Sequence, residues 1–507
     1  MISIPSNDFF AVSPLLIVIL TAMIVLMVDL ALPRDRKGLL VGISLIGLVA
    51  AVFASAALWG RGLNAFAGSV AADNFAILFQ FILLIVAGLS VLLSERYIQL
   101  KGINYGEYYA LMLFSTSGAM LMATSRELIT IFVGLEVLSI ALYILAGFAR
   151  TEARSEESAM KYFLLGAFSS GFFLYGIALL YGGTGTTRLD LMAQVPGGLQ
   201  SVYSIAGMAL LLVGLGFKAA IVPFHSWTPD VYEGAPTSVT AFMSAGAKAG
   251  AFAALIRVAI AFLPVSHYFH DVLWALAILT MIVGNIIAVQ QTNIKRMLAY
   301  SSIAHAGYIL VGLIAQNEVG RAGIIFYVLS YTFMNLGAFG ILILLARRGD
   351  ELTQIQDLEG LSERQPAAAA LMAIFMLSLA GIPPTAGFIG KFFLFSGAIQ
   401  AHEYWLASIG LLASVVGVFY YLWIIVRMYF KPARREFPTG IWNNSPGASI
   451  AVGFCALLSI LLGLVPSTFY NPSLSGAQSL IAPVAPIAAP AIPVAKAEGP
   501  QVSANVR

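Results

Sequence analysis

Charged residues are scarce in this sequence. Only 10% of its 507 residues are Asp, Glu, Lys or Arg, whereas a soluble fold carries about 25% because its surface faces water. Hydrophobic residues make up 60% of the chain, and the mean hydropathy is +0.90. This composition excludes a chain folded entirely in water and indicates a polytopic protein of the lipid bilayer.

Cysteine is almost absent, and this excludes further classes. Cys455 is the single cysteine, so the chain can form no internal disulfide and cannot by itself hold an iron–sulfur cluster, which typically needs four cysteines. The net charge of +3 is too small and too dispersed for nucleic-acid binding. We therefore expect no nucleic-acid partner, no metal and no cofactor site in this chain.

Apolar runs long enough to cross a hydrocarbon core of about 30 Å recur along nearly the whole chain. Their length and the scarcity of period-2 alternation favour helices over a barrel. The sequence predicts an all-α membrane protein of about fourteen spans. These lie at 11–32, 39–59, 74–93, 108–124, 127–148, 160–182, 201–222, 236–262, 270–289, 297–315, 321–346, 368–400, 404–430 and 449–470.

The distribution of Lys and Arg predicts the orientation. Loops after odd-numbered spans hold sixteen of these residues, whereas loops after even-numbered spans hold four, namely Arg61, Arg126, Arg188 and Arg321. The side rich in Lys and Arg is normally cytoplasmic. We therefore expect both termini on the non-cytoplasmic side of the cell's inner (plasma) membrane.

Several ionisable residues fall inside the predicted spans, where a charge costs several kcal/mol unless it is paired or hydrated. Glu136, Lys248 and His305 are central in their spans, and Lys218 and Lys391 lie further along theirs. Taken singly, Lys218 could snorkel, Glu136 and Lys248 could be a structural pair, and His305 could be a hydrogen-bonded core residue. Arg257, near a helix end, is most simply a snorkelling side chain. Together, the set predicts a lateral polar line able to pass protons.

Two spans contain proline-disrupted backbone close to a lysine. The seventh reads Lys218-Ala219-Ala220-Ile221-Val222-Pro223, and the twelfth has Gly381-Ile382-Pro383-Pro384 ahead of Lys391. Proline frees carbonyl groups, which are tolerable at membrane depth only within protein or beside water. Two broken helices five spans apart predict an inverted-repeat transporter with five helices in each repeat.

The motifs between and within these spans resemble a known family. Val231-Tyr232-Glu233-Gly234-Ala235-Pro236, Gly134-Leu135-Glu136-Val137-Leu138-Ser139 and Asn293-Ile294-Lys295-Arg296-Met297 are similar to segments of the subunit N family of bacterial complex I, the proton-translocating NADH:quinone oxidoreductase. The resemblance covers roughly residues 10–470. The first motif separates this family from the paralogous subunits and from the Mrp-type antiporters.

The resemblance implies a division of the chain and a set of site residues. It implies helices 1–3 in 1–107, repeats in 108–262 and 263–430, a last helix in 431–470, and an Ala/Pro-rich extended tail in 471–507. It implies a proton relay through Glu136, Lys218, Lys248 and Lys391, with His305, Glu157 and Lys295 as secondary candidates. Adjacent Glu156 leaves the position of Glu157 open by one residue.

The resemblance also implies the partners and the reaction. The chain would couple quinone reduction in neighbouring subunits to proton transfer, as part of an enzyme whose NAD, FMN, iron–sulfur clusters and quinone sit in partner subunits. Its partners would be the peripheral and membrane subunits of complex I, including paralogous antiporter-like subunits. Two alternatives stay open: a cation/proton antiporter subunit without redox coupling, and an architectural subunit whose buried charges only specify helix packing.

Overall fold

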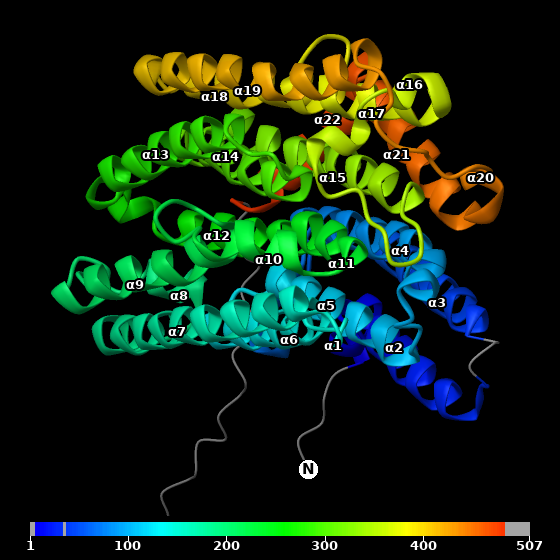
Figure 1. Cartoon of the computed structure of the whole chain (residues 1–507). Coiled ribbons are helices and arrows are strands. Elements are labelled where there is room, and N and C mark those ends of the chain that lie inside the picture. The colour runs from blue at the N-terminus through cyan, green and yellow to red at the C-terminus, as the bar shows by residue number, and fades with distance from the viewer. Residues whose placement is uncertain (1–5, 34–36, 482–507) are drawn as a thin grey trace, which may run out of the picture.

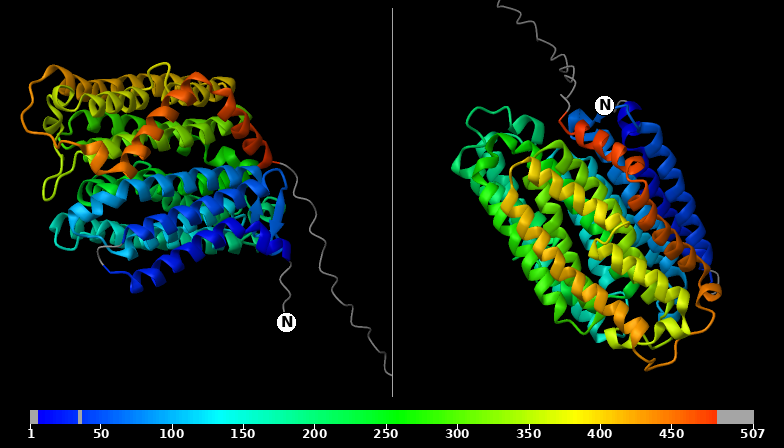
Figure 2. Two further views of the ribbon diagram at one scale, coloured as in Figure 1. Left: turned by 90° about the vertical axis from the view of Figure 1, so that its right-hand side faces the viewer. Right: turned by 90° about the horizontal axis from the view of Figure 1, so that it is seen from above.

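The computed structural model describes residues 6–33 and 37–481, and nearly all of the described chain is helical. The helices run roughly parallel to one another in one bundle (Figures 1 and 2). The N-terminal part contains a short hairpin between helices. Its elements are α1 (Ser6–Ala11), α2 (Ser13–Ala31), α3 (Gly38–Leu58), β1 (Leu63–Ala65), η2 (Phe66–Gly68), β2 (Val70–Ala72), α4 (Asn74–Lys101) and α5 (Gly106–Thr124).

The middle of the chain contains the first broken helix and a π-helical turn. Its elements are α6 (Leu128–Ala146), α7 (Ala153–Thr184), α8 (Leu189–Met192), α9 (Val202–Ala219), α10 (Trp227–Gly234), α11 (Thr237–Phe242), the π-helical η3 (Met243–Ala247), α12 (Lys248–Ala261) and η4 (Leu263–Tyr268).

The C-terminal half contains the second broken helix, α17 followed by α18. Its elements are α13 (His270–Val289), α14 (Ile294–Ile314), α15 (Glu318–Leu344), η5 (Ile355–Leu358), α16 (Leu361–Arg364), α17 (Pro366–Ala380), α18 (Ala386–Gln400), α19 (Tyr404–Phe430), α20 (Ile441–Asn444), α21 (Pro446–Leu464) and α22 (Ser467–Ser479).

The predicted spans agree with this architecture. Twelve helices of the described chain are long and apolar enough to cross a membrane, counting Thr237–Ala261 as one. The 19-residue α5 covers the fourth predicted span, and the shorter α17 and α18 together cover the twelfth. The prediction of an all-α multi-pass membrane protein is confirmed.

The centre of the bundle is formed by three spans from the middle of the sequence. The span Thr237–Ala261 is buried over its whole apolar window, and α14 and α15 are buried over 94% of theirs. Figure 1 shows α7 on one side of the bundle and α19 on the other, with α12, α14 and α15 between them. Polar groups on these three helices are therefore shielded from lipid by the rest of the chain.

The two broken helices end in the same way. The C-cap of α9 is Ala220, with φ +61°, and the C-cap of α17 is Gly381, with φ +83°. A cis peptide bond follows in each case, at Val222-Pro223 and at Pro383-Pro384. The left-handed conformation ends both helices and leaves carbonyl groups of the last turn without partners inside the helix.

The C-terminal segment differs from the expected extended tail. α22 continues to Ser479 although it contains Pro472. It is held by α4, because Asn74 donates to Ser475 Oγ (2.9 Å) and the backbone N–H of Phe75 donates to Ser479 Oγ (3.1 Å). The prediction of an extended chain is therefore wrong for 471–479. Residues 482–507 lie outside the described part of the chain.

Candidate functional site

The buried ionisable residues form two neighbouring groups. The first, the Lys218 group, lies at the contacts of α6, α7 and α9. Lys218 is 2% exposed, and its ammonium group donates to Ser139 Oγ (2.8 Å) and Tyr162 OH (3.0 Å). The ammonium also lies 5.0 Å from the ring centroid of Tyr162, an arrangement that stabilises a cation. Snorkelling therefore does not explain Lys218, whose charged end is enclosed by protein.

Glu136 lies one helical turn from Ser139 on α6, towards the outer side of the bundle. It is only partly buried, and the side chains of Val133 and Ile140 on the same helix are exposed. Its carboxylate accepts a hydrogen bond from Ser170. Glu136 and Lys218 thus each bond a different serine, Ser170 and Ser139. Glu136 forms no ion pair with Lys248 among the described residues, because Lys248 donates to the carbonyl of Ser302, so the structural pair considered for these two residues is not formed.

The second group, the Lys248–Lys391 row, begins at the start of α12. Lys248 follows the π-helical turn directly, and its ammonium group donates to the backbone carbonyl of Ser302 on α14. It also lies 6.0 Å from the ring centroid of Tyr331 on α15. π-helical turns are rare and frequently occur at functional sites. The π-helical turn therefore lies directly before Lys248, a predicted relay residue.

His305 is the middle of the row. Its Nδ1 lies 2.5 Å from Tyr327 OH, and its Nε2 lies 3.0 Å from Tyr421 OH. The imidazole centroid lies 5.1 Å from the Tyr331 ring and 5.6 Å from the Tyr308 ring. With both ring nitrogens in hydrogen-bonding range of hydroxyl groups, His305 can accept a proton on one side and release one on the other.

Lys391 ends the row at the second broken helix. Its ammonium group donates to the carbonyl groups of Leu379 (3.3 Å) and Ala380 (2.9 Å) and to Ser414 Oγ (2.8 Å). It lies 4.9 Å from the Tyr308 ring. The freed carbonyls at the C-terminus of α17 carry partial negative charge and stabilise this cation. At the first broken helix a carbonyl of the last turn of α9, that of Phe217, accepts from Trp227 Nε1 (2.9 Å).

Of the secondary candidates, Lys295 is buried and Glu157 is not. Lys295 is 3% exposed and donates to the carbonyl of Ala235, the C-cap of α10, at 2.7 Å. The Glu157 side chain is 63% exposed and pairs with Lys161 at 2.7 Å. Lys161 in turn pairs with Asp230, so Glu157 belongs to a surface network and is not brought into the buried groups.

The structure corrects the interpretation of Arg257. Its guanidinium donates to both carboxylate oxygens of Asp73, at 2.8 and 3.0 Å, and to the carbonyl of Ala123. Arg126 pairs with the same carboxylate at 3.0 Å. Burial alone would raise the pKa of Asp73, but the charges and hydrogen bonds of the two arginines lower it. Arg257 is a buried ion-pair residue and does not snorkel, because Asp73 caps α4 directly beside it.

Sequence analysis missed the aromatic and hydroxyl side chains that connect the charged residues. Tyr327 and Tyr331 are four residues apart on α15 and so lie on one face of that helix. The four-residue spacing of these tyrosines is visible in the sequence and could have indicated a polar face. A tyrosine pair in an apolar helix, however, more often serves ordinary packing. The contact with His305 on α14 depends on how the two helices pack.

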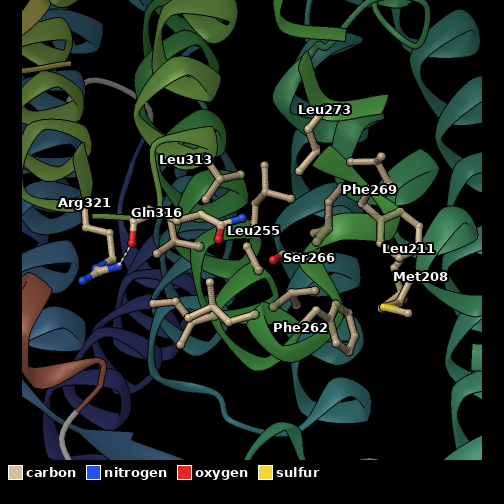
Figure 3. A pocket seen from close by; sticks show the side chains of 17 residues that line it. Met208, Leu211, Leu255, Phe262, Ser266, Phe269, Leu273, Leu313, Gln316 and Arg321 are labelled. Carbon is tan, nitrogen blue, oxygen red and sulfur yellow. Dashed lines mark hydrogen bonds between the residues drawn. The ribbon is translucent and has the colours of Figure 1, made fainter. Parts of the chain in front are cut away.

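One apolar pocket lies away from both groups. It is lined by α9, α12, η4 and the facing ends of α13, α14 and α15, and its polar lining is limited to Ser266, Gln316 and Arg321 (Figure 3). Arg321 donates to the carbonyl of Gln316 at 2.6 Å. None of the predicted relay residues lines this pocket, so the candidate site is the buried polar row and not the cavity. Among the described residues no group of three or more His, Cys, Asp or Glu side chains could hold a metal ion.

Comparisons with known proteins agree on one family. A family described as NADH:quinone oxidoreductase/Mrp antiporter, transmembrane, matches residues 125–417. NADH-quinone oxidoreductase subunit N of Trichlorobacter lovleyi is 52% identical over 90% of this chain and 94% of the relative.

Solved structures share the fold. A chain of respiratory complex I from Thermus thermophilus matches with a TM-score of 0.77 and 36% identity, covering 90% of this chain and 98% of that one. A chain of the Mrp complex from Dietzia sp. matches with a TM-score of 0.75 and 23% identity, covering 94% and 97%. The second likeness shows the fold alone.

Proposed function

The chain belongs to the NADH:quinone oxidoreductase/Mrp antiporter transmembrane family and, within it, to the subunit N proteins; from that premise we propose that it carries protons through the Lys248–Lys391 row. It acts as an antiporter-like membrane subunit of a proton-translocating NADH:quinone oxidoreductase. Quinone reduction takes place in neighbouring subunits, which hold the NAD, FMN, iron–sulfur and quinone sites. Paralogous antiporter-like subunits and peripheral subunits are its partners, and the membrane is the inner (plasma) membrane with both termini non-cytoplasmic.

One observation carries this proposal. From Lys248 to Lys391, each titratable or aromatic group lies within about 6 Å of the next, through Tyr331, His305 and Tyr308. All five side chains are buried. A row of charged and hydroxyl groups enclosed by apolar helices supports proton transfer, because each group can donate or accept and water can bridge the remaining gaps.

The Lys218 group supports a way of driving that transfer. Movement of Glu136 towards or away from Lys218 would change how well the lysine holds its proton, since an opposite charge favours the ammonium form. Moving one charge against 100 mV costs about 2.3 kcal/mol. A rearranged Glu–Lys interaction in a water-poor interior is of that size. The broken helices α9/α10 and α17/α18, one in each five-helix repeat (108–262 and 263–430), supply the polar backbone that the relay needs.

The test is proton translocation by the assembled complex in sealed vesicles. Lys248→Ala is expected to lower the ratio of protons moved to NADH oxidised, while NADH oxidation by an artificial electron acceptor stays normal and reports assembly. Lys431→Ala, at an exposed lysine after α19, is the matched control and should pump normally. An unchanged ratio in Lys248→Ala would remove the row from the mechanism and favour an architectural role.

A further inference from the structure

A carboxylate that sequence analysis did not single out closes the Lys/Arg-rich face of the bundle. Glu351 lies between α15 and η5, and its side chain is 15% exposed. One carboxylate oxygen accepts from Tyr97 OH (2.5 Å) and Lys101 Nζ (2.7 Å), both on α4. The other accepts from Thr237 Oγ1 at 3.0 Å. Glu351 thus joins α4 to the first residue of the fully buried span that carries Lys248.

The charges around Glu351 keep it ionised. Burial on its own raises the pKa of this carboxyl, but Lys295 and Lys101, with the hydrogen bonds from Lys101 and Tyr97, outweigh burial and leave the pKa below its usual value. Lys295 is the second residue of α14, and Thr237 is the first residue of α11. A carboxylate with one edge in contact with solvent and two lysines beside it holds a proton only briefly and releases it readily, as a group that passes protons on must do.

Two helices lead inward from this carboxylate to the relay. Lys248 lies eleven residues beyond Thr237, and Ser302 lies seven residues beyond Lys295. At a rise of 1.5 Å per residue these separations are about 16 Å and about 10 Å. The two helices meet again where Lys248 donates to the carbonyl of Ser302. A path from Glu351 to Lys248 therefore runs along α11, η3 and α14.

Buried polar atoms lie near the inner end of this path. Asn335 donates to Ser244 Oγ, one turn before Lys248. The hydroxyl groups of Ser302 and Tyr331 and the side-chain oxygen of Asn335 have no hydrogen-bond partner within the described chain. An unsatisfied buried polar atom costs about 1–3 kcal/mol, so water is expected where several such atoms converge. The polar lining next to Lys248 is built to hold water.

We infer that Glu351 is the group through which protons reach the Lys248–Lys391 row from the Lys/Arg-rich face. A hydronium ion at the face gives its proton to the carboxylate and becomes water. The neutral acid passes the proton to water beside Thr237, and that water passes it inward to the neutral amine of Lys248. Glu351 returns to carboxylate, Lys248 becomes ammonium, and one positive charge has moved inward. The inference rests on the proposed function, because it presupposes that Lys248 takes up a proton.

A purely structural role for Glu351 has a matched control on the same connection. Glu359 is also buried and pairs with Arg427 and Arg434, but these partners lie on α19 and in the segment after it, away from Thr237. If Glu351 only fastens the connection to the bundle, Glu351→Gln and Glu359→Gln should behave alike. If Glu351 passes protons, an added proton carrier should raise the turnover of Glu351→Gln and leave the turnover of Glu359→Gln unchanged.

The experiment measures NADH:quinone turnover of the purified complex in detergent, with and without formate, a small weak acid that can carry protons. Glu351→Gln is expected to slow turnover roughly tenfold or more, as loss of a proton-transfer group does. Added formate is expected to raise the turnover of this variant several-fold. Glu359→Gln should be insensitive to formate, and Glu351→Asp should retain most of the turnover without it.

Distinct outcomes separate this inference from the proposed function. Wild-type turnover in Glu351→Gln, or slow turnover that formate does not restore, would overturn the inference. Should Glu351→Gln fail to assemble, a Glu351→Asp variant that is slow and insensitive to formate would overturn it equally. Normal pumping by Lys248→Ala would instead overturn the proposed function, whatever Glu351→Gln does.

Discussion

The ammonium group of Lys218 donates a hydrogen bond to Ser139 Oγ at 2.8 Å. Ser139 lies three residues after Glu136 on α6, so the two side chains are about one helical turn apart on the same side of that helix. A buried ammonium has few acceptors available, and the position of this hydroxyl determines where the lysine side chain rests. The serine therefore holds the ammonium group of Lys218 against α6, the helix that carries Glu136.

Removing the Ser139 hydroxyl, which accepts from Lys218, should slow proton transfer. Ser139→Ala is expected to slow coupled NADH:quinone turnover several-fold to roughly tenfold, because a hydrogen bond to a buried charged group contributes about 1.5–3 kcal/mol. Ser44→Ala is the control, since Ser44 is equally buried but bonds only the carbonyl of Leu40 in its own helix. Equal turnover in the two variants would show that the hydroxyl has no part in transfer.

The hydroxyl groups around His305 should be needed for proton passage but not for packing. Tyr327→Phe and Tyr421→Phe each keep the ring and remove one partner of His305. We expect each to lower the proton-to-NADH ratio in sealed vesicles while the complex assembles normally. Tyr109→Phe, at a buried tyrosine on α5, serves as control. A wild-type proton-to-NADH ratio in both Tyr→Phe variants would contradict a proton route through His305.

The buried pair of Asp73 and Arg257 should be a large contribution to stability. Asp73→Asn leaves the buried Arg257 and the partly buried Arg126 without their carboxylate, and breaking a buried pair costs about 3–5 kcal/mol. The variant is expected to melt at a lower temperature than the wild-type complex in detergent, with Asp271→Asn, at a fully exposed carboxylate, as control. An unchanged melting temperature would mean that the pair is not needed to hold α4 against α12.

The same pair predicts a pH dependence of known sign. The pKa of Asp73 is lower in the folded chain than its ordinary value of 3.8, so folding favours the ionised form. The stabilisation that ionised Asp73 contributes is fully present above about pH 4. It is lost as the pH falls through the lowered pKa of Asp73 in the folded chain. The difference in melting temperature between wild type and Asp73→Asn should therefore be constant from neutral pH to about 5 and shrink below 4. A difference that grows with acidification would contradict this sign.

The second broken helix should not tolerate a methyl group at Gly387. A Cβ there would lie 1.8 Å from the carbonyl oxygen of Ser378, which belongs to the backbone of α17. Gly387→Ala is expected to prevent or weaken assembly, because the two halves of the broken helix cannot separate without losing the Lys391 contacts. Gly171→Ala on α7, where nothing lies within 4 Å of the added atom, should assemble normally. Normal assembly and pumping in Gly387→Ala would show that α17 and α18 move apart freely.

The sequence by itself determined the spans and the positions of the deep charges. Apolar runs of about 20 residues dictate membrane-spanning helices through local hydropathy alone, and proline beside Lys218 and Lys391 marks the broken helices, because a missing amide donor is a local property. Glu136, Lys248 and His305 could be singled out because an ionisable residue in the middle of an apolar run is visible in the sequence alone.

Only the tertiary structure decided the partners of those charges. Asp73 and Arg257 are 184 residues apart, and Tyr327 meets His305 because α14 and α15 pack face to face. Nothing in the sequence selected Glu351, whereas the family resemblance implied Glu157; burial in the folded chain distinguishes the two carboxylates. Side-chain pairing across helices depends on packing between distant segments, and no local pattern in a chain so uniformly apolar encodes it.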